Sequence, residues 1–180
     1  SVGPEVGGTR VSLLGGGFRD AYTLRCGFGG AWAPTLARYV DESQLECASA
    51  VRAVGVGLVR LSLNGQQYAV RSGASYAYQA AASVRSVSPA SALAEGGTPL
   101  TVVGGGFSSA SESLGVLTCR IGGAVRRAVW ASASAIVCNT TRAAAGESRV
   151  EVSNNAREYT SSGVRVRVVS VRVVEVQPWS

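Results

Sequence analysis

The chain has 180 residues, of which 46% are apolar and 16% charged, and 17 arginines against 11 acidic residues give a net charge of +6. This composition supports a packed core and excludes wholesale disorder, and no apolar run approaches the roughly 18 residues of a membrane span. Histidine is absent, so neither a Ser-His-Asp nor a Cys-His catalytic set can be built. We therefore expect a protein that is not an enzyme and needs no cofactor. Because the arginines are scattered singly apart from Arg126-Arg127, we interpret the basic charge as a solvated surface rather than a nucleic-acid stripe.

An internal repeat is visible in the sequence. Gly7-Gly8-Thr9 precedes a short alternating segment and then Gly15-Gly16-Gly17-Phe18. The same order returns at Gly96-Gly97-Thr98 and Gly104-Gly105-Gly106-Phe107, each 89 positions later. The chain is therefore predicted to contain two copies of one unit.

A proline after an alternating strand precedes each of these copies, at Pro4 and Pro89, and occurs again at Pro178. We expect two full units and the opening of a third, in a chain without methionine that was cut from a longer tandem array. The predicted domains are 1–82, 83–172 and 173–180. No linker rich in Gly or Ser separates the units, which predicts a stiff, end-to-end arrangement.

Each unit is predicted to be all-β. Residues 59–63 alternate as Val-Arg-Leu-Ser-Leu, which predicts a half-buried strand with Arg60 and Ser62 facing solvent, and residues 150–153 repeat the pattern. Turn signals recur about every eight to twelve residues, and no stretch shows a helical stripe. A unit of about 85–89 residues has the size of an immunoglobulin-like sandwich. Further strands are expected at 11–14, 38–40, 76–78, 100–103, 128–130 and 164–168.

The glycine triplets Gly15-Gly16-Gly17 and Gly104-Gly105-Gly106 are expected to form sharp turns, because only glycine adopts positive φ at little cost. Phe18 and Phe107 would then return to the core. A phosphate-binding loop is an alternative interpretation. It is disfavoured because the spacing is neither GxGxxG nor GxxxxGK[ST] and no helix is expected to follow.

The later part of each unit repeats as well. Cys26 begins Cys-Gly-Phe-Gly-Gly-Ala and Cys119 begins Cys-Arg-Ile-Gly-Gly-Ala. Cys47 and Cys138 each follow two residues of an alternating strand, and the segment from Asn64 to Tyr68 resembles 154–159.

Taken in order, these elements resemble the IPT/TIG domain: Val-x-Pro, Gly-Gly-Thr, Gly-x-Gly-Phe, Cys, Gly-Gly, Cys and a late Asn-x-x-x-Tyr. That family has an immunoglobulin-like fold and occurs in plexins, fibrocystin-type surface proteins and Rel-type transcription factors. The resemblance covers the whole chain twice and implies two tandem immunoglobulin-like β-sandwiches. It departs from the family pattern after each second cysteine, where the usual proline is absent. Because the family is defined by its fold, the resemblance does not define a function.

Four cysteines, two per unit, allow three pairings. Because each unit should close independently, the repeat favours Cys26–Cys47 and Cys119–Cys138. A zinc site is excluded by the lack of CxxC pairs and histidine, whereas four buried free thiols remain an alternative. Disulfides would indicate an oxidising compartment, either extracellular, at the cell surface or in the secretory lumen.

Two further features bear on sites. Asn139-Thr140-Thr141 is an N-glycosylation sequon, which predicts a glycan on Asn139 of a secreted protein. The acidic cluster Asp41, Glu42 and Glu46 lacks the spacing of a calcium loop, so we interpret it as a solvated turn and expect no metal.

The tryptophans are assigned to packing. Trp130 is expected to lie in the core and Trp32 at a loop or domain junction. The two are not equivalent positions in the repeat, which argues against a binding site shared by both units.

The leading hypothesis is a non-enzymatic extracellular structural or adhesion module of a larger multi-repeat surface protein. Its expected partners are neighbouring repeats of the same chain, other cell-surface proteins and acidic glycans, without membrane insertion by this segment. Two alternatives are kept. A Rel-like module of a transcription factor would bind DNA with steep salt dependence. An accessory module of a carbohydrate-active enzyme would bind polysaccharide near Trp32 or Trp130.

Overall fold

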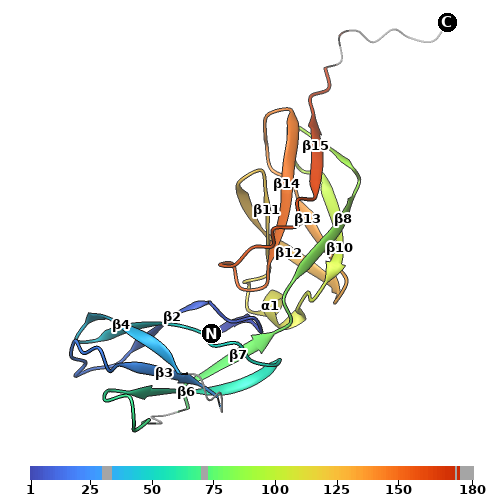
Figure 1. The fold of residues 1–180 in the computed structure, drawn as a ribbon. Coiled ribbons are helices and arrows are strands. Elements are labelled where there is room, and N and C mark those ends of the chain that lie inside the picture. Colours follow the sequence, from blue (N-terminus) through green and yellow to red (C-terminus); the bar gives the residue numbers. More distant parts are fainter. Residues whose placement is uncertain (30–33, 70–72, 173, 175–180) are drawn as a thin grey trace, which may run out of the picture. The chain divides into compact units, whose positions relative to one another are not determined.

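The computed structural model describes the chain except residues 30–33, 70–72, 173 and 175–180. It divides into two compact units, unit 1 from Ser1 to Ala81 and unit 2 from Ala82 to Ser180 (Figure 1). Each unit is a β-sandwich with its own core, as the alternating patterns predict. Trp32 and, apart from Val174, the expected third opening at 173–180 lie outside the described residues.

The described residues of unit 1 form seven strands. They are β1 (Val2–Pro4), β2 (Arg10–Leu14), β3 (Arg25–Phe28), β4 (Thr35–Asp41), β5 (Gln44–Ala48), β6 (Gly55–Ser62) and β7 (Ser75–Gln79). They pair in the order β1-β7-β6-β3-β4-β5-β2, antiparallel except for the parallel pair β1 and β7. The first residues of β4 pair with β3 and its later residues with β5, so this strand joins the two layers of the sandwich.

The described residues of unit 2 repeat this plan with one strand, β8, beyond those described in unit 1. The strands of unit 2 are β8 (Ser83–Ser88), β9 (Ser91–Leu93), β10 (Pro99–Gly105), β11 (Thr118–Ile121), β12 (Ala124–Ser132), β13 (Ala135–Asn139), β14 (Gly146–Ser153) and β15 (Arg165–Val169). Their order is β8-β10-β13-β12-β11-β14-β15-β9. Here β12 joins the layers, pairing first with β11 and then with β13.

The core of each unit consists of inward-facing residues from both layers. In unit 2 one continuous cluster includes Leu100, Ile136 and Val166, all fully buried. Unit 1 replaces the valines of β15 with Tyr76 and Tyr78. The Tyr76 ring meets the rings of Phe28 and Tyr78 edge to face. Aromatic rings packed edge to face bury a large apolar area. The predicted shared face of these two tyrosines is confirmed.

Burial changes the ionisation of one of these tyrosines. Burial, together with the neighbouring Tyr76, raises the pKa of Tyr78 to about 12, while Arg52 over its ring opposes the rise. The neutral phenol is therefore favoured by the fold. Its stabilising contribution is complete below the unfolded-state pKa of about 10 and is lost as the pH rises from there through about 12.

We expect Tyr78→Phe to keep unit 1 folded to higher pH than the natural chain. Circular dichroism during an alkaline titration measures this, and near-ultraviolet absorbance should lose the tyrosinate step near pH 12. The matched control is Tyr22→Phe, because Tyr22 is 90% exposed. Identical alkaline unfolding of Tyr78→Phe and the natural chain would contradict the assignment.

The sharp turns predicted for the glycine triplets involve fewer residues than expected. Only Gly17 and Gly106, the last residue of each triplet, have positive φ, at 75° and 72°. Gly104 and Gly105 continue strand β10, with a register shift after Val103. Phe18 and Phe107 are buried behind these turns, as predicted.

The first strand of unit 1 corresponds to a different repeat position from the one predicted. β1 pairs with β7 in parallel, as β9 pairs with β15, so Val2–Pro4 matches Ser91–Leu93. The carbonyl oxygens of Pro4 and Leu93 accept equivalent hydrogen bonds, at 3.0 Å, from the N–H groups of Gly7 and Gly96. Pro4 is therefore not the counterpart of Pro89. The repeat prediction aligned two prolines that lie in successive strands.

A short helix, α1 (Ser109–Ser113), was not expected. Ser108 caps it by accepting a hydrogen bond from the Ser111 N–H at 3.3 Å. Its Glu112 carboxylate accepts from the Trp130 backbone N–H at 2.9 Å. Trp130 packs against the core, as predicted, and its indole N–H donates to the Phe107 carbonyl at 3.2 Å. A single turn of small residues leaves no periodic signal in the sequence.

Candidate binding surface

Two disulfides connect the layers of the sandwiches. Cys26 on β3 is bonded to Cys47 on β5, and Cys119 on β11 is bonded to Cys138 on β13. All four residues are buried in the cores. Such bonds constrain the fold and present no chemistry to solvent, so the cysteines are structural. The described residues include no free cysteine.

Two residues of the predicted acidic cluster, Asp41 and Glu46, interact with neighbouring side chains and backbone. Asp41 accepts hydrogen bonds from the Ser43 hydroxyl and backbone N–H, both at 2.7 Å, which hold the pKa of its carboxyl below the usual value. Glu46 forms an ion pair with Arg38 at 3.2 Å. Over the described ranges, no group of three His, Cys, Asp or Glu residues is placed to hold a metal. Asn139 is exposed at the end of β13, accessible to a glycan.

A polar groove crosses the outer face of unit 2 over β11, β14 and β15. Its charged lining residues are Arg120, Glu147, Arg149, Glu151 and Arg165. Strand register places Arg120 opposite Glu151 and Arg149 opposite Arg165. The alternation of β14 brings its three charged residues to this face.

Glu151 is buried within the groove, although the alternating pattern predicted a solvent-facing side chain. It is only 5% exposed, because the segment from Asn154 to Gly163 folds over the end of β14. Its carboxylate accepts hydrogen bonds from the Thr160 hydroxyl and, at 3.4 Å, from the Ser162 N–H. Glu151 therefore fastens the rim of the groove to β14.

Arg120 is held in place by an aromatic ring. Its guanidinium lies 4.3 Å from the centroid of the Tyr159 ring. The hydroxyl of Tyr159 is 3.0 Å from that of Thr118. A stacked arginine keeps its donor groups in a plane that suits carboxylate or sulfate oxygens. Arg120 is thus oriented before any ligand arrives.

A tight turn positions this tyrosine. The Asn155 side chain accepts hydrogen bonds from the Arg157 and Glu158 N–H groups, both at 3.1 Å, and from the Ser153 hydroxyl. In unit 1 Asn64 makes the same turn, accepting from the Ser62 hydroxyl and from backbone N–H groups. The repeat therefore aligns Asn64 with Asn155 rather than Asn154. Both serines are fully buried by the turn, so the predicted exposure of Ser62 is wrong.

The groove is lined by three arginines and two glutamates, so its charged side chains carry a net charge of +1. Arg149 and Arg165 are exposed and directly opposed in register, and like charges at such positions repel. Among the described residues, neither of these two arginines forms an ion pair with a carboxylate. An anionic group bound between the two arginines would relieve this repulsion.

The described residues of unit 1 do not repeat the groove. The positions of Arg120 and Glu151 are taken by Gly27 and Arg60, which are paired in register. A Cβ added at Gly27 would lie 3.6 Å from the Tyr68 ring, so the tyrosine covers the glycine instead of an arginine. The face is also more apolar than in unit 2. Val56 and Leu58 on β6 are 66% and 43% exposed.

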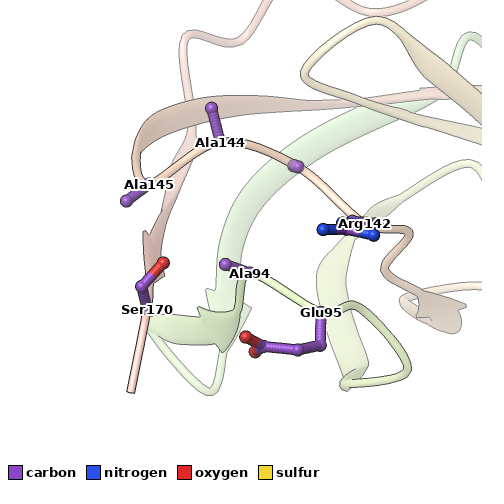
Figure 2. Close-up of a pocket in the computed structure, with 7 residues that line it drawn as sticks. Ala94, Glu95, Arg142, Ala144, Ala145 and Ser170 are labelled. Atoms are coloured by element: carbon purple, nitrogen blue, oxygen red, sulfur yellow. The ribbon is translucent and has the colours of Figure 1, made fainter. Parts of the chain in front are cut away.

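A second hollow in unit 2 lies beside β9 (Figure 2). Ala144 and Ala145 form one side with Ser170, and Glu95 and Arg142 lie on the other. Alanine offers few directional contacts, and Glu95 and Arg142 form no ion pair. The groove with three arginines is therefore the stronger candidate for binding.

These features define a class of protein: immunoglobulin-like sandwiches in tandem, each with a disulfide between its layers. Residues 82–168 match the family model described as the IPT/TIG domain, so unit 2 is a member of that family. The described residues of unit 1 have the same order of strands, without a counterpart of β8. No curated protein sequence matches the chain. Within the described residues no helix is long and apolar enough to span a bilayer.

Solved structures provide the second comparison. A plexin A4 extracellular region with domains 1 to 10 is 19% identical, with a TM-score of 0.50 over 94% of this chain and 15% of that chain. A second plexin A4 structure, with domains 1 to 8, is 20% identical, with a TM-score of 0.46 over 93% of this chain and 17% of that chain. SGBP-B of the Bacteroides ovatus mixed-linkage glucan utilization locus, in complex with a mixed-linkage heptasaccharide, is 17% identical. Its TM-score is 0.38 over 91% of this chain and 42% of that chain. The likeness concerns the fold, and this chain spans a small part of either plexin structure.

The groove was not predicted. Arg120, Arg149 and Tyr159 stand in separate strands or loops, and nothing in their spacing brings them together. The one local signal was the alternation at 147–151, which sends Glu, Arg and Glu to one face.

Proposed function

We propose that the chain is a non-enzymatic, extracellular structural and binding module of a larger multi-repeat surface protein. The IPT/TIG domain of unit 2, the tandem plan and the two disulfides support this proposal. Disulfides persist in oxidising compartments, which favours a secreted or surface location. Neighbouring repeats of the same protein are its proposed structural partners, and Asn139 is a proposed glycosylation site.

The proposed contact site is the groove of unit 2, which binds acidic groups of another surface molecule. The main observation is that Arg149 and Arg165 lie opposite each other and that neither forms an ion pair with a carboxylate of the described residues. Arg120, which is stacked on the Tyr159 ring, lines the same groove. Arginine forms bidentate hydrogen bonds with carboxylates and sulfates. Carboxylates of a protein partner and sulfates of an acidic glycan share this chemistry.

A double variant, Arg149→Gln with Arg165→Gln, tests the groove. We expect its affinity for heparin or for poly-glutamate to fall about tenfold or more, since each charge-assisted hydrogen bond contributes about 1.5–3 kcal/mol. The matched control is Arg60→Gln with Arg85→Gln, which removes the same charge from exposed positions outside the groove. Isothermal calorimetry measures both. Equal losses in the two double variants would show diffuse electrostatics and contradict a built site.

The choice of probe separates the acidic partners and the DNA alternative. Tighter binding of poly-glutamate than of heparin favours a protein partner, and the reverse favours a glycan. Duplex DNA bound more tightly than either, with affinity falling steeply as salt rises, would support the transcription-factor alternative. Weak binding of DNA that does not depend on salt would remove it.

A further inference from the structure

The outer face of one layer of unit 2 is made of uncharged side chains. Strands β8, β10, β13 and β12 pair in that order in this layer. Their register aligns two neighbouring rows of outward-facing residues, the first with Ser88, Thr101, Val137 and Val129 and the second with Pro99 and Asn139. These six residues alternate along their strands with residues that pack in or against the core. We call them the neutral face.

Two valines at the centre of the neutral face point outward. Val137 stands between Ile136 and Cys138 on β13, and both of these neighbours are fully buried. Val129 opposes Val137 on β12 and is 60% exposed. Its own neighbours along β12 pack in or against the core. Two apolar side chains are therefore presented together on the outer surface of this layer.

The corresponding positions of unit 1 carry charges. Arg38 and Glu46 oppose each other on β4 and β5, as the two valines do on β12 and β13. Their side chains form an ion pair at 3.2 Å. The counterpart of Asn139 is Ala48, which also follows a disulfide cysteine, and the sequence of unit 1 contains no N-glycosylation sequon. The unit with the sequon thus has an apolar pair where the unit without it has a charged pair.

Asn139 lies on the neutral face itself, two residues beyond Val137 along β13. Side chains two residues apart on a strand point to the same side and lie about 6.8 Å apart. A glycan on the Asn139 amide nitrogen therefore begins beside the two valines. Arginines of the same strands lie at the margins of the face: Arg85 is the bulged residue of β8, and the guanidinium of Arg127 lies next to Gly115.

We propose that the first sugars of a glycan on Asn139 lie along β13 and cover Val137 and Val129. The C–H groups of sugar rings pack against apolar side chains, and sugar hydroxyls form hydrogen bonds with the hydroxyls of Ser88 and Thr101. A neutral sugar cannot compensate a charge that it buries, so a face that it covers has to be uncharged. The ion pair of unit 1 is consistent with this condition, because that face carries no sequon. This proposal rests on the proposed glycosylation of Asn139 and is independent of the groove of unit 2.

Cleavage by an endoglycosidase tests the cover. The full chain is secreted from eukaryotic cells that attach high-mannose glycans, and the folded product is treated with an enzyme that cuts between the first two sugars. The test variant, Val129→Arg with Val137→Glu, places the ion pair of unit 1 on the neutral face. We expect its glycan to be cleaved about tenfold faster than that of the natural chain, because cleavage requires the sugars to leave the face. The two chains should be cleaved at equal rates after denaturation.

Val125→Arg is the matched control for this experiment. Val125 is an exposed valine of the same strand, but it opposes Arg120 where β12 pairs with β11 in the other layer. Its replacement should leave the cleavage rate unchanged. Equal acceleration by the control and the test variant would show a general effect of charge and overturn the proposal.

Mass spectrometry of the peptide that contains Asn139 separates two kinds of failure. A bare Asn139 in the secreted chain would overturn the glycosylation and the cover together. A glycan that is present but is cleaved equally fast in the natural chain and the test variant would overturn the cover alone.

Thermal unfolding gives a second measure of the cover. Asn139→Gln removes the glycan, and we expect it to lower the melting temperature of unit 2 by about 4 °C or more in the natural chain. The same substitution in the Val129→Arg, Val137→Glu background should have a smaller effect, since the packed sugars are already displaced. Equal decreases in the two backgrounds would overturn the proposal. Sedimentation that shows a dimer of the glycosylated chain, lost in the test variant, would assign the face to a second copy and overturn it as well.

Discussion

Replacing both Cys119 and Cys138 with alanine is expected to destabilise unit 2 by about 3 kcal/mol. The bond joins residues 19 positions apart in the sequence. It stabilises the fold because it lowers the conformational entropy of the unfolded chain, so less entropy is lost on folding. A domain of this size has a total stability of about 5–15 kcal/mol, so the loss is a large share. Alanine is chosen because both positions are fully buried and a serine hydroxyl would be left without a partner.

Urea unfolding of the full chain under non-reducing conditions measures this loss. The disulfide of unit 1, Cys26–Cys47, stays intact in that variant and provides an internal reference. The reciprocal variant, with both of those cysteines replaced, should lose a similar amount from unit 1, because its loop of 21 residues is nearly as long. A change below about 1 kcal/mol in both variants would show that the bonds contribute little to folding.

The second large effect is expected at Gly104. A Cβ there would overlap the backbone oxygen of Ser83 and lie 2.9 Å from the ring of Phe107. Neither neighbour can move freely, since one is strand backbone and the other is a buried ring. We expect Gly104→Ala to cost about 3 kcal/mol, the upper end of the range for overpacking.

Gly105→Ala is the matched control for this substitution. Its Cβ would meet only the Ser83 hydroxyl oxygen, at 3.4 Å, so we expect a change within about 0.5 kcal/mol. Urea unfolding of both variants gives the comparison. If the two alanines have equal effects, the close approach of β8 is not what requires glycine at position 104.

The sequence predicted the fold because repetition and alternation are encoded locally. Two copies of the glycine triplet, with a phenylalanine after each, located the units and the turns. The pattern Val-Arg-Leu-Ser-Leu at 59–63 identified strand β6 within unit 1. Each of these signals depends on neighbouring residues along the chain, and a sandwich of short strands produces many of them.

The same local reasoning failed where distant segments fold over a strand. Glu151 and Ser153 alternate with buried valines and were expected to face solvent. They are buried because 154–163 returns over β14, which alternation cannot indicate. The alignment of Pro4 with Pro89 failed for a similar reason. Only the pairing of β1 with β7 distinguishes β1 from a strand of the β8 type. The arginine groove likewise exists only once β11, β14 and β15 are side by side.

Mass spectrometry of non-reduced peptides from the natural source tests the central proposal most directly. The proposed extracellular module predicts linked peptides for Cys26–Cys47 and Cys119–Cys138, with no free thiol. The peptide that contains Asn139 should carry the added mass of a glycan. Four free thiols in the native material would contradict the oxidising compartment and support the intracellular DNA-binding alternative. Links between the two units would contradict their independent closure.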